Sequence, residues 1–567
     1  DEMIAVMYDM IMHDLKRGVV SPDWKQVIYV LLKKPGNDGD VVGDRREIAL
    51  MAHEMKVLMQ TVRWTCYNRV ARRVISAQAG WTAGMGAPDL ALAASAVIQQ
   101  AKELQHDLYV LYVDLATFFG SIDRGILYAV ELWHGVPEDV LELAMLIFGA
   151  ADDPEGAVDC KYDSAAGLSP AFKNPRGALM GDVLSPDKAK ILLNSIVAAI
   201  ALSARGVRLW GWGAVEQMRT WREIMSLAFA DDWRGCFTDA AEVRKAWTLW
   251  RAWEPISGCK LGIKRHAKTV LTAVTWKDGV AVTPPDPVLL TAAGEQVPYM
   301  PCDEAYKYLG IWQQLDGDET HAWKMTKHKF TAALARLRRV HAGSCTPADF
   351  CVISDALIGG IGSYYCKPKY ISWEQAEEVE CAWRRIYNSK FERARSSPRV
   401  TLYAQGGAGK GGRSHLWSTA ISSLFDCVYQ AMADAHDSPA RRAARSTVAR
   451  SAARWGCRED PAKWELGDLI GDVEARLRRS ACKDIGDAWW VAAGLLNGAA
   501  PGEGHLAFWE ERADDDPMCA KAAHFTPLRS PPLFRPVSVG GAGIAPRAQL
   551  ILCLLYTSDA ADDGLSV

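Results

Sequence analysis

The sequence predicts an α+β fold, and three observations support that prediction. Segment 27–32 (VIYVLL) is rich in the β-branched and aromatic residues that favour strands. Two apolar runs, 110–113 and 227–230, also have the length of strands, and each ends in aspartate. Longer stretches with helical character lie around them, at 48–76, 90–104, 187–200, 321–340, 350–395 and 415–500.

The composition is that of a globular protein and excludes several functional classes. The chain has 567 residues, of which 49% are hydrophobic and 23% charged. No apolar run reaches the roughly 18 residues needed to cross a bilayer, so no membrane partner is expected. The net charge of -3 excludes a chain that is basic throughout, so any nucleic-acid contact must be local.

The cysteines point to an intracellular protein, in the nucleus or the cytoplasm. Fourteen are present without a CxxC pair, which disfavours a zinc site. We expect them to be reduced thiols that are mostly packed in the core. Most of the 22 tryptophans are likewise expected in the core rather than stacked on bases.

The first motif runs from Asp114 to Asp123 (DLATFFGSID), directly after the apolar run 110–113. An acid at a strand end followed by aromatic residues suits a site that holds a metal-bound nucleotide. Taken alone the motif is weak, because apolar strands often end in aspartate for capping or turn reasons.

The second motif runs from Arg176 to Pro186 (RGALMGDVLSP). Gly177 and Gly181 permit close approach of the backbone to a ligand. Pro186 then lies at the first turn of the predicted helix 187–200. A plain loop before a helix explains this motif equally well when it is taken alone.

The third motif is Phe229-Ala230-Asp231-Asp232, in which the apolar run 227–230 ends in two adjacent acids. A buried unpaired carboxylate is unfavourable by several kcal/mol, so two side by side favour a bound cation. An acidic turn after a strand is the alternative.

Together and in this order, the three motifs resemble the palm of a reverse transcriptase. Four flanking segments are similar to further elements of that family: Arg46–Leu50, Gln78–Trp81, Ser257-Gly258 with Lys268-Thr269, and Tyr306–Gly310. The resemblance covers roughly residues 20–400, and the layout is closest to enzymes of non-LTR retrotransposons and group II introns.

The resemblance implies an RNA-directed DNA polymerase of a mobile element, with an RNA template, a DNA or RNA primer and dNTPs as partners. Asp114, Asp231 and Asp232 would be catalytic and would hold two Mg²⁺ ions, with Mn²⁺ as an alternative ion and the Leu115 carbonyl as a further oxygen ligand. Nucleotide binding would involve Arg46, Leu115, Phe119, Met180, Gly181 and Lys268, and less certainly Lys33 or Lys34.

Three of these residues would have distinct roles. Phe119 would lie under the incoming sugar and exclude a ribose 2′-hydroxyl. Arg46 would bind the triphosphate through its bidentate guanidinium group. Lys268 would assist the leaving pyrophosphate, although a solvated turn lysine is an equal alternative.

Met180 stands where the family usually has glutamine, and Gly120 where many relatives have aspartate. Met180 offers packing without hydrogen bonds. A catalytically decayed, RNA-binding descendant is therefore the alternative function, which the intact Asp114, Asp231 and Asp232 oppose. An RNA-dependent RNA polymerase would share the palm, but Phe119 disfavours it.

The expected architecture is a right-hand polymerase fold with fingers, a palm of antiparallel sheet plus helices, and a helical thumb. The expected domains are fingers at 1–105, palm at 106–300, primer grip and thumb at 301–400, and a helical C-terminal region of unknown role at 401–552. Two basic helices, 321–340 in the thumb and a second from Arg441 to Arg458, are candidates for nucleic-acid contact.

Residues 553–567 resemble the translation of a sequencing adapter, and a genuine acidic tail is the alternative. Because the sequence begins at Asp1 rather than methionine, we expect its N-terminal end to be truncated, and the adapter-like segment leads us to expect the same of its C-terminal end. No endonuclease or RNase H signature is visible between them.

Overall fold

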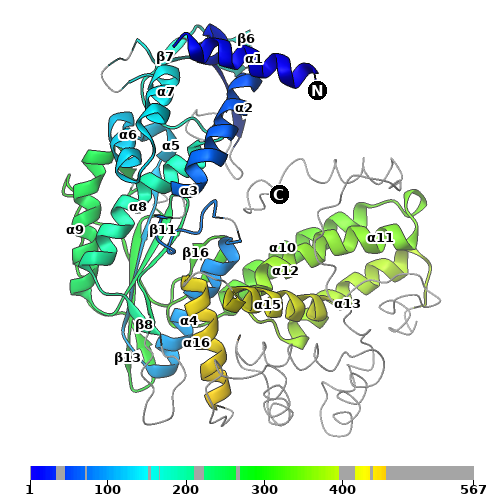
Figure 1. The fold of residues 1–567 in the computed structure, drawn as a ribbon. Helices are drawn as coiled ribbons and strands as arrows, with labels where there is room; N and C mark the ends of the chain where they lie inside the picture. Colours follow the sequence, from blue (N-terminus) through cyan, green and yellow to red (C-terminus); the bar gives the residue numbers. More distant parts are fainter. Residues whose placement is uncertain are drawn as a thin grey trace. The chain divides into compact units, whose positions relative to one another are not determined.

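The computed structural model describes residues 2–18, 20–33, 45–70, 73–82, 84–150, 153, 155–164, 167–209, 222–263, 268–394, 415–433, 438–454 and 485. The chain forms two compact units. The first comprises Asp1–Ala87, His106–Val207 and Met225–Pro301, and the second Pro88–Gln105, Arg208–Ile224 and Cys302–Val567. Figure 1 shows the elements coloured along the chain. The mixed α+β class is confirmed.

The first unit contains a central, mainly antiparallel sheet. Its strand order is β10-β11-β3-β13-β14, and β15 pairs with β13 in parallel. The bounds are β3 Leu108–Val113, β10 Ser226–Phe229, β11 Asp232–Phe237, β13 Val270–Lys277, β14 Val280–Val282 and β15 Tyr299–Met300. Both apolar runs that precede the aspartates are therefore strands, as predicted.

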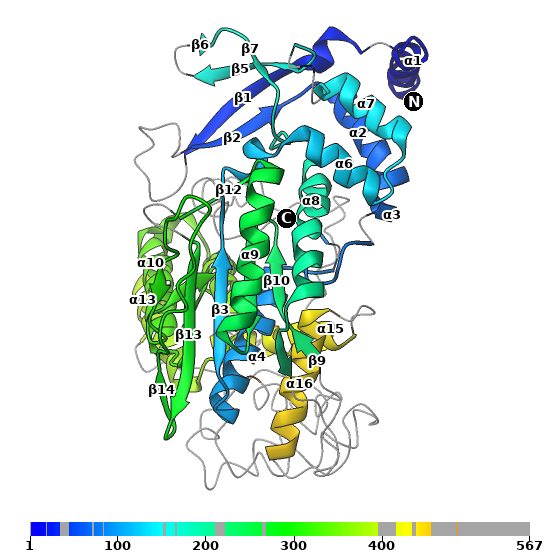
Figure 2. The same ribbon diagram turned by 90° about the vertical axis from the view of Figure 1, so that its left-hand side faces the viewer.

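Helices α8 (Ser185–Ser203) and α9 (Ala240–Ser257) lie along this sheet, as Figure 2 shows. All six residues of β3 are buried, and Leu111, Leu192 and Trp250 belong to one apolar core. The Asp239 side chain caps the start of α9, which ends at Gly258 in the left-handed conformation. The core thus fixes β3 and β11 against two helices.

A second sheet of this unit has the order β2-β1-β5-β6, and β7 pairs with β5. The bounds are β1 Gln26–Lys33, β2 Arg45–Leu50, β5 Val158–Ser164, β6 Gly167–Leu168 and β7 Phe172–Asn174. The remaining helices of the unit are α1 Glu2–Lys16, η1 Pro22–Lys25, α2 His53–Val62, η3 Arg63–Tyr67, α3 Asn68–Val70, α5 Phe118–Ser121, α6 Arg124–Trp133 and α7 Glu138–Phe148. Short strands β4 (Leu115–Ala116) and β12 (Lys260–Leu261) pair with each other.

The predicted helix 48–76 is wrong at its first residues and at 74–76, which the structure places outside any helix. Ile48, Ala49 and Leu50 pair with Val30, Tyr29 and Ile28 of β1, and the helix begins only at His53. Tertiary pairing with a neighbouring strand overrides local helical character there.

The second unit is mostly helical. Among its described residues, the helices are α4 Ala87–Leu104, α10 Thr320–Arg339, η5 Ala342–Ser344, α11 Pro347–Ser354, η6 Asp355–Gly359, α12 Gly360–Cys366, α13 Trp373–Lys390, α15 Leu416–Ala433 and α16 Pro439–Arg454. Strands β16 (Tyr306–Tyr308) and β17 (Ile311–Gln313) form a hairpin, and β8 (Val207–Leu209) pairs with β9 (Arg222–Ile224). The helices predicted at 90–104, 321–340, 350–395 and the start of 415–500 are thereby confirmed.

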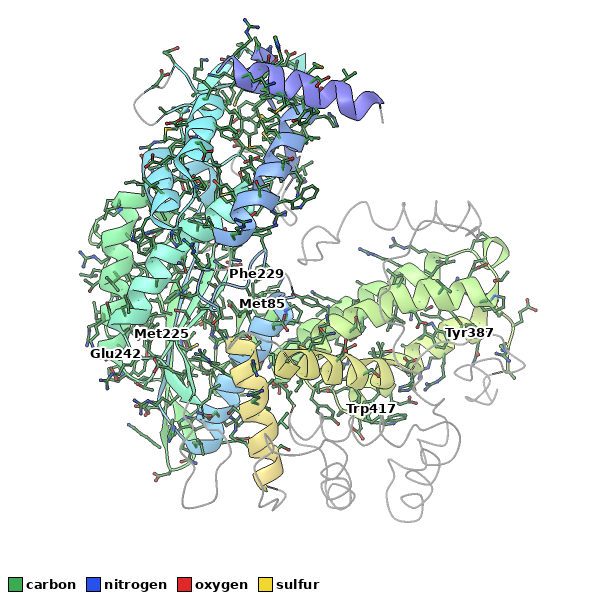
Figure 3. All side chains as sticks on the ribbon, viewed as in Figure 1. Met85, Met225, Phe229, Glu242, Tyr387 and Trp417 are labelled. Atoms are coloured by element: carbon green, nitrogen blue, oxygen red, sulfur yellow. The ribbon has the colours of Figure 1, made fainter. Side chains whose placement is uncertain are left out.

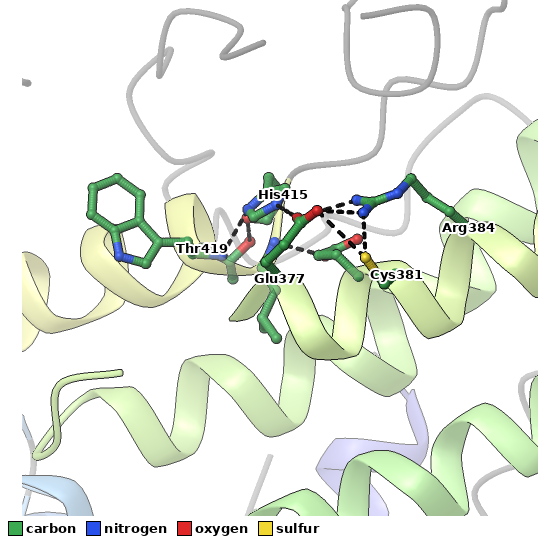
Figure 4. Close-up of polar contacts among 8 residues, drawn as sticks. Glu377, Cys381, Arg384, His415 and Thr419 are labelled. Carbon is green, nitrogen blue, oxygen red and sulfur yellow. Dashed lines mark hydrogen bonds and ion pairs between the residues drawn. The ribbon is translucent and has the colours of Figure 1, made fainter. Parts of the chain in front are cut away.

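A polar network joins α13 to the residue before α15 in this unit (Figure 4). Glu377 accepts hydrogen bonds from Arg384 and is paired with His415 Nε2 at 3.3 Å. The His415 ring stacks on Trp373 at 4.7 Å, and Trp373 and Trp417 are buried. Charged and aromatic contacts therefore fix the start of α15 against α13.

Several expectations lie outside the described residues: Lys34, Arg458, and the chain beyond 485, including 553–567. Every described cysteine is a free thiol, and most are buried, as expected. Among the described helices, none combines the length and apolar character that crossing a bilayer requires.

Candidate active site

Strand pairing brings the acids of the first and third motifs to the same end of the central sheet. Val113 of β3 pairs with Trp233 of β11 in antiparallel register. One residue further, Asp114 and Asp232 therefore face each other across the two strands. Asp231 lies in the two-residue turn between β10 and β11, because Phe229 pairs with Asp232. Figure 3 labels Met225, the residue before β10, and Phe229, the last residue of β10, which leads into this turn.

Lys268 joins this group from the other side of β3. Val270 pairs with Tyr112, so two residues further Lys268 lies opposite Asp114. Lys268 Nζ lies 3.3 Å from Asp114 Oδ1. The sequence assigned Lys268 to the nucleotide site by resemblance, and the structure pairs it with a proposed metal ligand.

Thr269 and Gly262 fix the backbone of Asp114. The Thr269 hydroxyl accepts from the Asp114 N–H at 3.0 Å and donates to the Asp114 carbonyl at 3.3 Å. The Gly262 N–H donates to the same carbonyl at 2.9 Å. A Cβ on Gly262 would lie 2.9 Å from Asp114 Oδ2, so a larger residue there would displace the Asp114 side chain. These contacts hold one acid of the site in place.

Burial and mutual repulsion shape the electrostatics of the three acids. Burial, and then the charge of Asp231, raise the pKa of Asp232 to about 7. Burial is likewise the main reason why the pKa of Asp231 is raised, and Asp114 raises it further. Lys268 and Arg46 act in the opposite direction on Asp231. Burial would lower the pKa of Lys268, but the carboxylates outweigh it and raise that pKa.

The donor atoms and the charge of this group fit Mg²⁺. The acids supply only oxygen donors, and the hydrogen-bonded turn keeps two of them adjacent. Within the described residues, no three His, Cys, Asp or Glu side chains are grouped closely enough to form a metal shell by themselves. Magnesium at phosphoryl-transfer sites uses one or two carboxylates plus phosphate and water, so a complete protein shell is not required.

Phe119, a residue of the first motif, is held by two aromatic neighbours. Its ring lies 5.4 Å from Phe118 and 5.8 Å from Trp81, both edge-on. Its carbonyl accepts from the Ala178 N–H at 2.8 Å. A Cβ on Gly177 would lie 2.6 Å from the same carbonyl. The first and second motifs are therefore in direct contact through their backbones.

The second motif also contacts β2, the strand that carries Arg46. The Ala49 N–H donates to the Met180 carbonyl at 2.6 Å. Gly181 has φ +118°, and a Cβ there would lie 2.4 Å from the Ala49 carbonyl oxygen. Arg46 is exposed and close enough to Asp231 to affect its pKa. Met180 and Gly181 thus contact Ala49, in the strand that carries Arg46. Among the contacts of the described residues, none joins Lys33 to the acids.

Two residues of the segment 78–81 belong to the site more closely than the sequence indicated. Trp81 packs against Phe119, and the Gln78 side chain bonds to Ala230, which immediately precedes Asp231. In the sequence, residues 78–81 were similar to an element of the reverse transcriptase family. That similarity did not assign a role to Gln78 or Trp81.

No family model and no curated protein matches the chain. Solved structures that match include apo telomerase from Candida tropicalis truncated from the C-terminal domain, with 13% identity over 47% of this chain and 54% of that chain and a TM-score of 0.31.

Two further matching structures are also telomerases. Apo telomerase from Candida tropicalis has 11% identity over 76% of this chain and 69% of that chain, with a TM-score of 0.36. Telomerase from Candida albicans in complex with a TWJ fragment of telomeric RNA has 10% identity over 81% and 63%, with a TM-score of 0.30. The chain spans about half the length of the truncated telomerase.

Proposed function

We propose that the chain is an RNA-directed DNA polymerase of a mobile retroelement, which copies an RNA template into cDNA by two-metal phosphoryl transfer. The main support is the placement of Asp114, Asp231 and Asp232 at one end of the central sheet, with Lys268 3.3 Å from Asp114. Acids on adjacent strands beside one lysine leave an excess of negative charge, which suits divalent cations. The retroelement context is supported by the sequence motifs.

Asp114, Asp231 and Asp232 would hold two Mg²⁺ ions, which when bound would activate the primer 3′-hydroxyl and neutralise the triphosphate. The protein would hold these acids at the sheet end by strand pairing and by the bonds of Thr269 and Gly262 to Asp114. Positioning of this kind accounts for most of the catalysis in phosphoryl transfer.

The surrounding residues would bind the dNTP. Phe119, fixed by Trp81, would contact the sugar and exclude a 2′-hydroxyl. Arg46 would bind the triphosphate with its guanidinium fork. Met180 and Gly181 would lie beside the base, and Lys268 would leave Asp114 to neutralise or protonate the pyrophosphate.

The template and primer are proposed to contact basic helices. In α10, Lys324, Lys327, Arg338 and Arg339 are exposed, and Lys327 also pairs with Glu378 at 2.5 Å. A positive helix face of this kind suits the phosphate backbone of a duplex. The domain boundaries expected from the sequence, with fingers, palm and thumb, remain part of this proposal.

A catalytically decayed RNA-binding protein is the second candidate, and Met180 is the observation that favours it. Primer extension on poly(rA)/oligo(dT) with Mg²⁺ separates the two candidates. An active enzyme incorporates dTTP, whereas a decayed descendant binds RNA without incorporation.

The decisive control is Asp231→Asn. Removal of one carboxylate charge is expected to reduce dTTP incorporation by at least about a thousandfold. The reason is that Mg²⁺ would be held less tightly and would no longer neutralise the charge that develops on the triphosphate. Binding of the RNA template, measured by fluorescence anisotropy, should remain within about twofold of the unmodified protein. Retained incorporation by Asp231→Asn would refute the assignment of this residue.

A further inference from the structure

The Gln78 side chain pairs with the peptide groups of Ala230, the residue before Asp231. Gln78 Nε2 donates to the Ala230 carbonyl at 3.2 Å, and Gln78 Oε1 accepts from the Ala230 N–H at 3.2 Å. Gln78 Oε1 also accepts from the Gly80 N–H at 3.0 Å. The side chain is 2% exposed, so these bonds are shielded from water.

The backbone around Gln78 extends the central sheet beyond β10. The Ala228 N–H donates to the Ala77 carbonyl at 2.9 Å, and the Ala79 N–H donates to the Ala228 carbonyl at 2.8 Å. A Cβ on Gly80 would lie 2.3 Å from the Ala230 backbone nitrogen. Segment 77–80 therefore packs directly against the turn that carries Asp231.

Ala230 has φ +56°, a left-handed conformation that is unfavourable for alanine. Strain of this kind persists only where neighbouring contacts impose it. The carboxamide of Gln78 forms hydrogen bonds with both the N–H and the carbonyl of Ala230. These bonds hold the left-handed conformation from the side of the turn opposite β11.

We propose that Gln78 is a positioning residue for the acidic turn: its carboxamide holds Ala230 in the left-handed conformation and thereby sets where Asp231 and Asp232 bind the cations. The proposal rests on the proposed polymerase function for its catalytic consequence. The bracing of the turn itself is independent of that function and is tested separately.

The test compares Gln78→Met with Gln100→Met in the full chain. Methionine keeps the length of the side chain and removes both hydrogen-bonding groups. Gln100 is a matched control because it is 1% exposed and also donates to a backbone carbonyl, that of Arg208, in the other compact unit.

Three measurements are made on each protein. Hydrogen–deuterium exchange follows the peptide that spans 226–233, and electron paramagnetic resonance of Mn²⁺ gives the dissociation constant of the cation. Primer extension gives the Mg²⁺ concentration for half-maximal activity. Thermal unfolding is recorded in parallel, to separate local from global effects.

We expect Gln78→Met to speed exchange in 226–233 and to raise the Mn²⁺ dissociation constant by about tenfold, with primer extension reduced by ten- to a hundredfold. Gln100→Met should change none of these beyond its effect on the unfolding temperature. Unchanged hydrogen–deuterium exchange in 226–233 would refute the claim that Gln78 holds the turn in place. Faster exchange with unchanged Mn²⁺ affinity and Mg²⁺ dependence overturns the positioning role and leaves only a structural one.

If the proposed polymerase function is wrong, the unmodified protein itself fails, and not only Gln78→Met. If the unmodified protein neither extends a primer nor binds Mn²⁺, the proposed function is wrong, and the exchange measurement alone decides whether Gln78 braces the turn. Should Gln78→Met fail to fold, Gln78→Asn replaces it. Asparagine keeps the carboxamide but is one methylene shorter, so it cannot reach both polar groups of Ala230, and the same readouts and outcomes apply.

Discussion

At the scale of single residues, the site depends on an excess of acid over base. Asp231 and Asp232 are adjacent and partly buried, Asp114 faces them, and Lys268 is paired with Asp114 at 3.3 Å. Burial and the neighbouring charge raise the pKa of Asp232 to about 7. Such an arrangement is unfavourable for folding, and the cations that we propose for this site would offset its negative charge.

Phe119 provides a prediction about nucleotide choice. Its ring packs edge-on against Trp81 and Phe118, which favours one ring position beside the proposed sugar site. Phe119→Ala is expected to raise the kcat/KM for UTP by at least about tenfold relative to dTTP, because the steric conflict with the 2′-hydroxyl is removed. Single-nucleotide incorporation measures the ratio, and an unchanged ratio would refute the steric role.

At the scale of elements, α8 contains a buried lysine that joins three segments of the first unit. Lys188 is 3% exposed, lies 5.0 Å from the Phe148 ring centroid, and interacts electrostatically with Glu131 and Asp182. The Tyr67 hydroxyl donates to Glu131 at 2.7 Å. Asp182 belongs to the second motif, so this cluster anchors the loop that carries Met180 and Gly181.

Lys188→Met is expected to lower the free energy of unfolding by about 3–5 kcal/mol, because two buried carboxyl groups lose their cation. Urea unfolding followed by tryptophan fluorescence measures the change. The control is Lys245→Met, which removes a half-exposed pair with Glu242 at 2.7 Å and should cost less than about 1 kcal/mol. Equal effects of the two substitutions would contradict the anchoring role of Lys188.

At the scale of the whole molecule, the chain has separate apolar cores in its two units. Leu111 lies in a core of the first unit, and Phe330 and Trp383 lie in the core of the second. Units with their own cores commonly unfold as separate cooperative blocks.

We therefore expect more than one transition in differential scanning calorimetry. Leu111→Ala and Phe330→Ala should each destabilise one unit by about 2–5 kcal/mol and lower a different transition. A single transition that both substitutions shift together would show that the units unfold as one.

Much of the site was predictable from sequence because strand ends and motif order are local properties. The runs before Asp114 and Asp231 are strands, and the helix after Pro186 forms as expected. The helix predicted from residue 48 was wrong at Ile48–Leu50, since pairing with β1 depends on residues about 20 positions earlier.

The sequence by itself determined the α+β class, the acids and aromatic residues of the candidate site, and the similarity of their order to reverse transcriptases. Only the tertiary structure decided which residues support them. Lys268 faces Asp114 because β13 pairs with β3 in one register, and Gln78 bonds to Ala230 because segment 77–80 lies beside β10. Strand register and sheet-edge contacts join residues up to about 150 positions apart, and no local pattern in the chain encodes such pairings.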